Sequence, residues 1–294
     1  MRHVFLFLTV FSLSAGKTWS EGFPTLKLGA GGRASALGLA YTALSDDGSA
    51  GFWNAAGLCF VGRNDVVLSV HRWIGDVQSE FVGFGWGDGR TGFGFHMLYT
   101  EVGGIEHRIV PSPTPLAVFS SHEFVGGISF ARMIGRRISV GLTAKVLYEK
   151  IFFDEALGAA CDIGFLWKVW DEGLRVGGVL QNMGKTGRLQ DEAIALPFTG
   201  RLGLAFSVFG LGGKWVFVAD GVKERDFPFH LHSGVEYGWK DVLYLRCGYQ
   251  TGYETRDLTW GMGVAWHGFR LDYTTMPFRR GIGDSHRLTV GVGW

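Results

Sequence analysis

The sequence predicts an all-β protein: a transmembrane antiparallel β-barrel of about 14 strands, with an N-terminal hatch inside the lumen. The first observation is composition, because 47 of the 294 residues are glycine. Each interior glycine destabilises a helix by roughly 1 kcal/mol, so this content is unfavourable for a mostly helical chain. The second is a two-residue alternation of apolar side chains, and the third is an alternation of short and long connections, as in outer-membrane barrels.

Charge and hydropathy narrow the function classes. The 28 Lys and Arg residues balance 27 Asp and Glu residues, so no basic excess suggests a nucleic-acid partner. Only 19% of residues are charged, and 24 are Phe and 11 Trp, which argues against disorder. The chain also lacks a run of 18 consecutive apolar residues, so membrane-spanning helices are not expected.

Residues 1–20 read as a secretory signal peptide. Arg2 and His3 precede an apolar run over residues 4–13, and small residues follow at 14–16. We expect cleavage between Ala15 and Ser20, and therefore export to the periplasm. The 3 cysteines are an odd number, which does not suit a disulfide framework.

Residues 21–60 do not alternate cleanly and hold the most specific motif. The stretch contains R-A-x-x-x-G, D-D-x-S-A and W-N-x-A-G-L, and it resembles the N-terminal signature of the FadL-like outer-membrane superfamily, particularly the branch of PorV and PorQ. The resemblance implies a hatch that folds into the lumen and is closed by an Asn-Pro-Ala turn. Its predicted residues are Arg33, Asp46, Asp47, Ser49, Trp53, Asn54 and Ala55.

Two features of this motif qualify the resemblance. Ala55 stands where the family has proline, which frees the backbone φ angle and restores an N–H donor, so we expect a less rigid turn. Asp46, Asp47, Ser49 and Asn54 also suit ordinary helix capping and turn chemistry, and that alternative stays open.

Residues 61–294 are predicted to form the barrel. In residues 137–149, for example, apolar side chains occupy the even positions and polar or small ones the odd positions. Most such runs match the 9 to 11 residues of a tilted membrane strand. They lie at about 64–72, 78–86, 91–99, 122–133, 137–149, 155–168, 173–182, 197–208, 212–221, 228–238, 242–250, 256–266, 268–275 and 285–294.

A secreted β-sandwich is the alternative fold, and composition argues against it. The wetted face of a sandwich is rich in Lys, Glu and Thr, whereas these polar faces are mostly glycine with isolated charges, which suits a crowded barrel interior. The alternation also continues to Trp294. A terminal aromatic strand resembles the insertion signal read by the barrel-assembly machinery of bacterial outer membranes.

The polar faces of the predicted strands would line the lumen. Arg246, Arg270 and Arg287 are predicted to hold Asp46 or Asp47, because buried charges pair. The predicted lumen charges are Lys145, Asp162, Arg201, His230, His232, Glu236, Arg246, Arg270, Asp272 and Arg287.

No catalytic or metal site is predicted among these residues. His230, His232 and Glu236 share one face and could bind a metal, but no spacing fixes a further ligand, so hydrogen bonding is favoured. Ser233 would point away from His232, and G-x-S-x-G is missing, so we expect neither an enzyme nor a cofactor.

The connection over residues 101–121 is predicted to be a long outer loop that carries apolar groups. It could capture a hydrophobic ligand, or it could simply fold over the barrel mouth. The candidate capture residues are Ile105, Ile109, Leu116 and Phe119.

The resemblance implies an outer-membrane channel for hydrophobic compounds such as long-chain fatty acids, which would pass by diffusion. The expected partners are outer-membrane lipid and a hydrophobic small molecule. The alternative is a PorV-like accessory or shuttle protein for secretion or surface attachment, whose loops bind proteins. An apolar lumen pocket would favour uptake, whereas a lumen closed by charge pairs would favour the accessory role.

Overall fold

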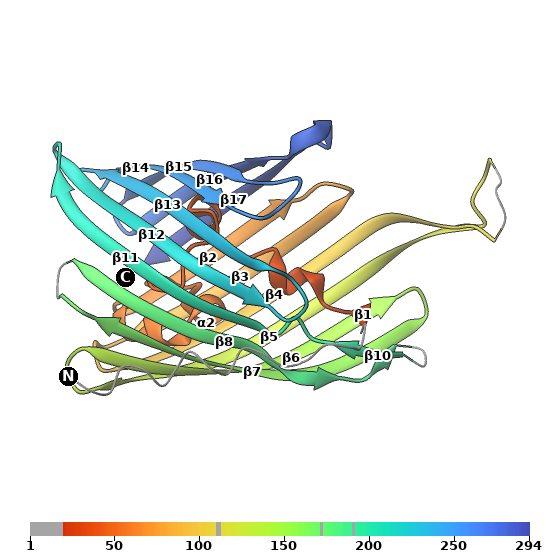
Figure 1. Ribbon diagram of the computed structural model, residues 1–294, viewed down its shortest axis with the longest axis horizontal. Helices are drawn as coiled ribbons and strands as arrows, with labels where there is room; N and C mark the ends of the chain where they lie inside the picture. Colours follow the sequence, from red (N-terminus) through yellow and green to blue (C-terminus); the bar gives the residue numbers. More distant parts are fainter. Residues whose placement is uncertain (1–19, 110–112, 171–172, 190–191) are drawn as a thin grey trace.

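A computed structural model describes residues 20–109, 113–170, 173–189 and 192–294. The signal-peptide prediction, apart from Ser20, falls outside these residues. The described chain forms a closed antiparallel barrel of 14 strands, shown in Figure 1, which confirms the predicted fold.

The barrel strands follow the chain from β2 to β17, with β9 and β10 outside the wall. The barrel closes where β17 pairs with β2, and Asn64 and Trp294 exchange backbone hydrogen bonds there. The wall consists of β2 (Asn64–Arg72), β3 (Val77–Gly87), β4 (Thr91–His107), β5 (Ala117–Ile134), β6 (Ile138–Ile151), β7 (Asp154–Lys168), β8 (Leu174–Thr186), β11 (Thr199–Gly210), β12 (Gly213–Glu224), β13 (Phe229–Trp239), β14 (Leu243–Gln250), β15 (Leu258–Trp266), β16 (Phe269–Pro277) and β17 (Asp284–Gly293).

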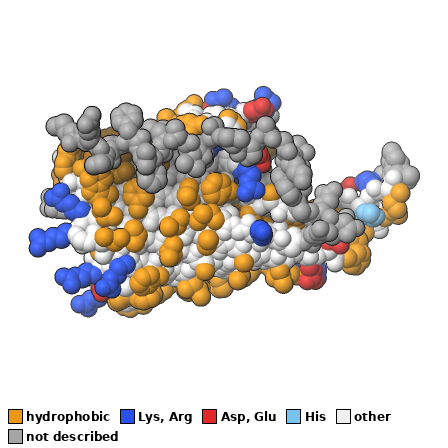
Figure 2. Space-filling model, turned by 60° about the horizontal axis from the view of Figure 1, so that its bottom comes forward, with side chains coloured by type: hydrophobic (Ala, Val, Ile, Leu, Met, Phe, Trp, Pro, Cys, Tyr) orange, Lys and Arg blue, Asp and Glu red, His pale blue; other side chains and the backbone are white. Residues whose placement is uncertain are grey.

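Apolar side chains point outward from this wall. On β6, Leu142 and Val146 are 56% and 60% exposed, whereas Thr143 and Lys145 are buried in the lumen. Hydrophobic side chains accordingly cover much of the outer surface in Figure 2. An apolar exterior and a polar interior are what a lipid-embedded barrel requires.

No helix among the described residues is long and apolar enough to span a membrane.

The two ends of the barrel differ. Short turns join β3 to β4, β5 to β6, β11 to β12, β13 to β14 and β15 to β16 at the end where Trp294 lies, which we call the short-turn end. The opposite, long-loop end carries a hairpin that projects far beyond the wall in Figure 1. Short turns face the periplasm in outer-membrane barrels, so the hairpin faces outward from the cell.

The prediction of an irregular loop over residues 101–121 was wrong. β4 continues to His107 and β5 starts at Ala117, with one irregularity between Val102 and Ile105. Cross-strand pairing continues because it satisfies the backbone groups that a loop would leave to water. The connection over 187–198 also contains β9 (Arg188–Leu189) and β10 (Glu192–Ala195), which form a small sheet with β1 (Ser20–Glu21).

Residues 22–60, called the hatch below, lie mostly inside the barrel. The hatch contains η1 (Pro24–Lys27), α1 (Gly32–Ala36), α2 (Ala50–Trp53) and η2 (Ala55–Phe60); a further turn, η3 (Arg279–Gly281), lies between β16 and β17. α1 packs on β14 to β17, and η2 packs on β3 to β7. The hatch therefore reaches both sides of the lumen.

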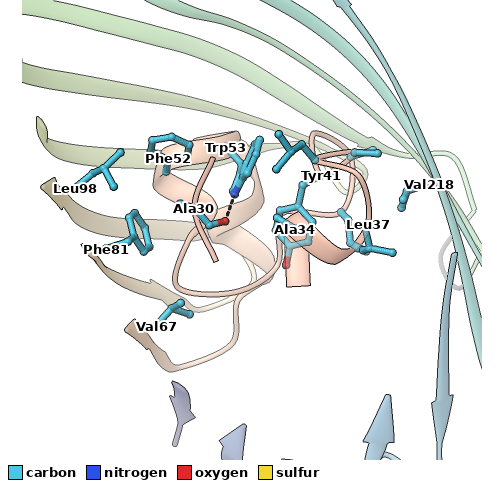
Figure 3. Packing of buried hydrophobic residues seen from close by; sticks show 14 of the residues in the cluster. Ala30, Ala34, Leu37, Tyr41, Phe52, Trp53, Val67, Phe81, Leu98 and Val218 are labelled. Atoms are coloured by element: carbon cyan, nitrogen blue, oxygen red, sulfur yellow. Dashed lines mark hydrogen bonds between the residues drawn. The ribbon is translucent and has the colours of Figure 1, made fainter. Parts of the chain in front are cut away.

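The main apolar core lies between the hatch and the wall. Trp53 and Tyr41 are buried beside Phe52, and Phe81, Leu98 and Val67 approach from β2 to β4 (Figure 3). The Trp53 indole N–H donates to the carbonyl of Ala30 at 3.0 Å. A large aromatic residue with a satisfied N–H thus forms the centre of the hatch.

Glycines on the inner wall allow this close packing. A Cβ at Gly141 would lie 2.2 Å from the backbone nitrogen of Ala56, and one at Gly248 would lie 2.1 Å from that of Gly38. Any larger residue would push the hatch away at these two positions.

Candidate functional site

Arg33 of α1 is the centre of an ion-pair network that joins the hatch to the wall. Its Nε and Nη2 atoms each donate to the Glu236 carboxylate at 2.8 Å, and Nη1 donates to Asp46 at 2.7 Å. The bidentate geometry suits the planar guanidinium group. Arg175 of β8 contacts the other oxygen of Asp46 at 3.2 Å.

The network continues along the wall. Arg246 Nε donates to Glu236 at 2.6 Å, and Arg246 Nη1 donates to Asp272 at 2.5 Å. The Glu236 and Arg246 side chains are each only 4% exposed. A buried chain of alternating charges satisfies its members only while all are present.

The hatch charges respond to this environment. Burial raises the pKa of Asp46, but Arg33 and Arg175 lower it further, so the net pKa lies below the ordinary value. Burial and the neighbouring Asp47 raise the pKa of Tyr41 well above the usual value. The structure therefore favours an ionised Asp46 and a protonated Tyr41.

The predicted partners of Asp46 and Asp47 were wrong. Arg270 pairs with Asp65 at 2.7 Å, and Arg246 pairs with wall carboxylates. Arg287 donates to the carbonyls of Gly29 at 2.9 Å and Leu28 at 3.1 Å. The three arginines share one face of the sheet, but they sit at different depths along it, and strand pattern alone does not fix depth.

The capping alternative accounts for part of the motif. Asp47 accepts from the backbone N–H and the hydroxyl of Ser49, and from the Tyr41 hydroxyl at 2.8 Å. Asn54 accepts from the backbone N–H of Ala56 at 3.2 Å and thereby caps η2. Asp46, in contrast, is an ion-pair partner. The motif thus combines local turn chemistry with one wall anchor.

Ala55 is the first residue of η2. The preceding Asn54 is extended, with φ −159° and ψ 102°, and so it avoids the helical region that a following proline disfavours. The residue before Ala55 therefore has a backbone conformation that is compatible with proline at position 55.

A bulge in β8 holds the end of α2. Gln181 donates from Nε2 to the carbonyls of Phe52 at 2.9 Å and Trp53 at 3.1 Å. Asn182 has φ 61°, which marks the bulge where the pairing with β7 shifts. Gln181 thereby satisfies helix-end carbonyls that would otherwise be orphaned, while Asn182 donates from its side-chain amide to the carbonyl of Pro197 at 2.9 Å.

The same bulge closes a second buried ion pair. Lys145 lies 2.7 Å from Asp162 and 2.8 Å from the side-chain oxygen of Asn182. Farther around the lumen, Asp220 accepts from the backbone N–H groups of Tyr41 and Thr42 at 3.0 Å. Each predicted lumen charge described so far contacts the hatch or a neighbouring wall charge.

Arg201 and the two histidines lie near the long-loop end of the lumen. Arg201 donates to the Leu39 carbonyl at 2.6 Å and lies over the Trp53 ring. His230 donates from Nδ1 to the Thr251 carbonyl at 2.9 Å, and His232 contacts the Tyr253 hydroxyl at 3.1 Å. Glu236 is occupied by arginines instead. Within the described ranges, no group of three or more His, Cys, Asp or Glu residues could hold a metal.

Several lumen residues escaped the sequence analysis. His96 is fully buried between Phe52 and Phe81, and neither ring nitrogen has a hydrogen-bond partner among the described residues. Asp65 and Glu123 bind the backbone N–H groups of Gly48 and Thr25. The alternation of β2, β4 and β5 puts all three on the inner face, and this alternation is the sequence signal that marks them as lumen residues.

Two cavities lie on opposite sides of the hatch. The first, of about 280 Å³, opens toward the short-turn end and is lined by the Arg33 network together with Lys214, Asp241 and Tyr244. The second, of about 20 Å³, lies between the hatch and Tyr253, Arg256 and Glu224 near the long-loop end. The hatch separates these two cavities, and charged residues line both.

The projecting hairpin is apolar at its tip. Ile109 and Leu116 are 76% and 65% exposed, whereas Ile105 and Phe119 are partly covered. The Phe119 ring lies 4.8 Å from that of Phe152 in the β6–β7 turn, where Phe153 is 81% exposed. Apolar groups therefore gather at the outer mouth of the barrel.

A closed, lipid-facing 14-strand barrel with a plugged polar lumen defines a bacterial outer-membrane protein of the channel fold. The fold is similar to the crystal structure of the Pseudomonas putida toluene transporter TodX, with a TM-score of 0.66 and 13% identity over 90% of this chain and 96% of that one. A TodX ΔS2S3 mutant, described as a monoaromatic hydrocarbon channel, gives a TM-score of 0.61 and 15% identity over 90% and 98% of the two chains. At these identities the likeness concerns the fold.

Comparisons of sequence give a higher identity than the structural ones, but they cover a smaller part of this chain. The model of an uncharacterised protein family, UPF0164, matches residues 11–151. A UPF0164 protein of Treponema pallidum (strain Nichols) is 30% identical over 223 residues, which are 65% of this chain and 51% of that protein. The chain spans about half the length of this curated relative.

Proposed function

We propose that this protein is a gated outer-membrane channel for hydrophobic compounds such as long-chain fatty acids. The observation that carries the proposal is the fold shared with a toluene transporter over almost the whole barrel. The apolar tips of the β4–β5 hairpin and the β6–β7 turn support it, because they offer a first contact for an apolar solute where the wall meets the outside.

The described conformation is a closed state. The hatch fills the lumen with its aromatic core, and charged side chains line the cavities on either side. An apolar ligand would gain little in such cavities, since ligand sites are mostly apolar. Passage therefore requires displacement of the hatch, with the Arg33 network as the restraint that must break.

A disulfide lock tests this requirement. A Cβ at Gly32 would lie 3.3 Å from that of Thr289, close to the 3.5 to 4.5 Å of natural disulfides. Gly32→Cys with Thr289→Cys, in a background in which the 3 native cysteines are alanine, joins α1 to β17. The variant is expressed in the outer membrane of a Gram-negative host that lacks its own fatty-acid channel.

Uptake of labelled oleate and toluene is then measured with and without reductant. We expect the oxidised protein to block uptake and the reduced protein to restore it, while each single-cysteine variant behaves as the parent. Equal uptake in both redox states would show that the path avoids the hatch. If the unmodified protein gives no uptake above the empty host, transport itself is refuted.

A second candidate is a PorV-like accessory or shuttle role in protein secretion or surface attachment. The observation that favours it is the lumen, which holds many charge pairs and whose two cavities beside the hatch are lined by charged residues, beneath an exposed apolar platform. A photo-crosslinking residue at Val118 on the hairpin should then trap one exported protein in the native organism. The same residue at Leu211 in a short turn is the control, and the disulfide lock should leave the crosslink unchanged.

A further inference from the structure

Four arginines crowd one sector of the short-turn end. Arg90 lies in the β3–β4 turn, Arg132 faces outward near the end of β5, and Arg136 and Arg137 form the β5–β6 turn; all are exposed. We call these four residues the arginine patch. Cationic side chains gather at the end opposite the projecting hairpin in Figure 2.

The side chains of the arginine patch form no direct ion pairs within the described residues. The nearby Asp88 is engaged by the backbone N–H groups of Arg90 at 2.7 Å and Thr91 at 2.6 Å. Arg132 donates only to the Thr91 hydroxyl, at 3.0 Å. Asp88 also interacts electrostatically with Arg132, so the four arginines and this one carboxylate leave a net positive charge.

An aromatic strip lies next to the patch on the lipid-facing wall. Trp86, Phe93 and Phe130 are successive cross-strand neighbours on β3, β4 and β5, with ring centroids 5.8 Å and 5.1 Å apart. Phe93 is 49% exposed and Phe130 is 43% exposed. Since Arg132 is two residues beyond Phe130 on the same face, the charges begin where the apolar strip ends.

At the long-loop end several charges are paired, although Arg72 and Arg280 are exposed there and form no ion pair within the described residues. There Arg108 pairs with Glu106 at 2.7 Å, Lys150 pairs with Glu155 at 3.7 Å, and Arg279 pairs with Asp257. Balanced pairs suit a surface that faces water. An unbalanced patch beside an apolar strip instead suits a ligand that is anionic at one end and apolar along its length.

We propose that the arginine patch and the aromatic strip together bind an anionic phospholipid of the periplasmic leaflet. The guanidinium groups of Arg132 and Arg136 hold the headgroup phosphate, for which their forked donors are well suited. The acyl chains lie along Phe93 and Phe130. The short-turn end is at headgroup depth in this leaflet, and basic clusters at such depth attract anionic lipid.

Native mass spectrometry of the detergent-purified full-length protein tests the site. The protein is incubated with dioleoylphosphatidylglycerol or with dioleoylphosphatidylcholine, and retained lipid is counted. The test variant is R132Q/R136Q. The matched control is R72Q/R280Q, which removes the same charge from exposed arginines at the long-loop end. Heat-modifiable gel migration reports whether each variant is a folded barrel.

We expect preferential retention of phosphatidylglycerol, reduced about tenfold in R132Q/R136Q and unchanged in the control. Equal retention of the two lipids would overturn the proposal, as would an equal loss in both variants. A third arm adds inorganic phosphate in excess over lipid. Full displacement by phosphate would reassign the patch as a simple anion site, whereas persistence of the lipid supports the joint role of headgroup and chains.

Discussion

Glu236→Gln should release the hatch without disrupting the barrel. Glu236 receives two hydrogen bonds from Arg33 and one from Arg246, at 2.6 to 2.8 Å. The amide keeps the shape of the carboxylate but removes the only charge between the two guanidinium groups. One wall residue therefore links Arg33 of the hatch to Arg246 of the wall.

The magnitude follows from burial. Glu236 and Arg246 are each 4% exposed and Arg33 is 23% exposed, so solvent screens little of the lost attraction. Removing one partner of a buried pair costs about 3 to 5 kcal/mol, and glutamine still accepts one hydrogen bond, so the lower limit applies. A loss of about 3 kcal/mol lowers the ratio of docked to released hatch about 150-fold.

Hydrogen exchange of the hatch amides measures this ratio, because exchange there requires local opening. Lys214→Gln is the control, since Lys214 lines the same cavity and pairs with no carboxylate of the described ranges. The reasoning is refuted if hatch amides in Glu236→Gln exchange at the parental rate, or if Lys214→Gln accelerates them equally. Combining Glu236→Gln with Arg33→Gln should recover part of the loss, because the uncompensated cation is then removed.

Three further predictions concern the hatch. Asp46 has a folded-state pKa below its ordinary value of 3.8, so the stabilisation from its charge is present above pH 3.8 and is lost as the pH falls through the folded-state pKa. Hydrogen exchange of the hatch amides, corrected for intrinsic rates, should therefore accelerate below about pH 4. Asp46→Asn should flatten this pH dependence. Ala55→Pro should stabilise the hatch by about 0.4 to 1 kcal/mol in thermal unfolding, because η2 begins there with an extended residue before it, and destabilisation would contradict the geometry. Gly141→Val should expel η2 and expose the hatch to protease while the barrel still forms, since its Cβ would meet the Ala56 nitrogen at 2.2 Å. Gly210→Val is the control and should leave protease sensitivity unchanged, because a Cβ there has no atom within 4 Å.

Much of the fold was accessible from local pattern. In lipid each strand must place apolar groups outside and polar groups inside, so apolar and polar residues alternate along each strand. This alternation predicted β2 at its observed bounds, 64–72. The same pattern misled at the β4–β5 hairpin, where the lipid requirement ends but pairing continues to His107 and Ala117. Strand length beyond the membrane depends on cross-strand pairing, which single-strand periodicity does not report.

The sequence by itself predicted which side of the wall most strand residues take, although the bulge in β8 puts both Gln181 and Asn182 inside. Only the tertiary structure decided the partners. Arg33 and Glu236 are 203 positions apart, and Arg270 binds Asp65 instead of the predicted hatch acids. The physical reason is that pairing in the lumen depends on strand register, on depth along the barrel and on the path of the hatch, and all three are set by closure of the whole barrel.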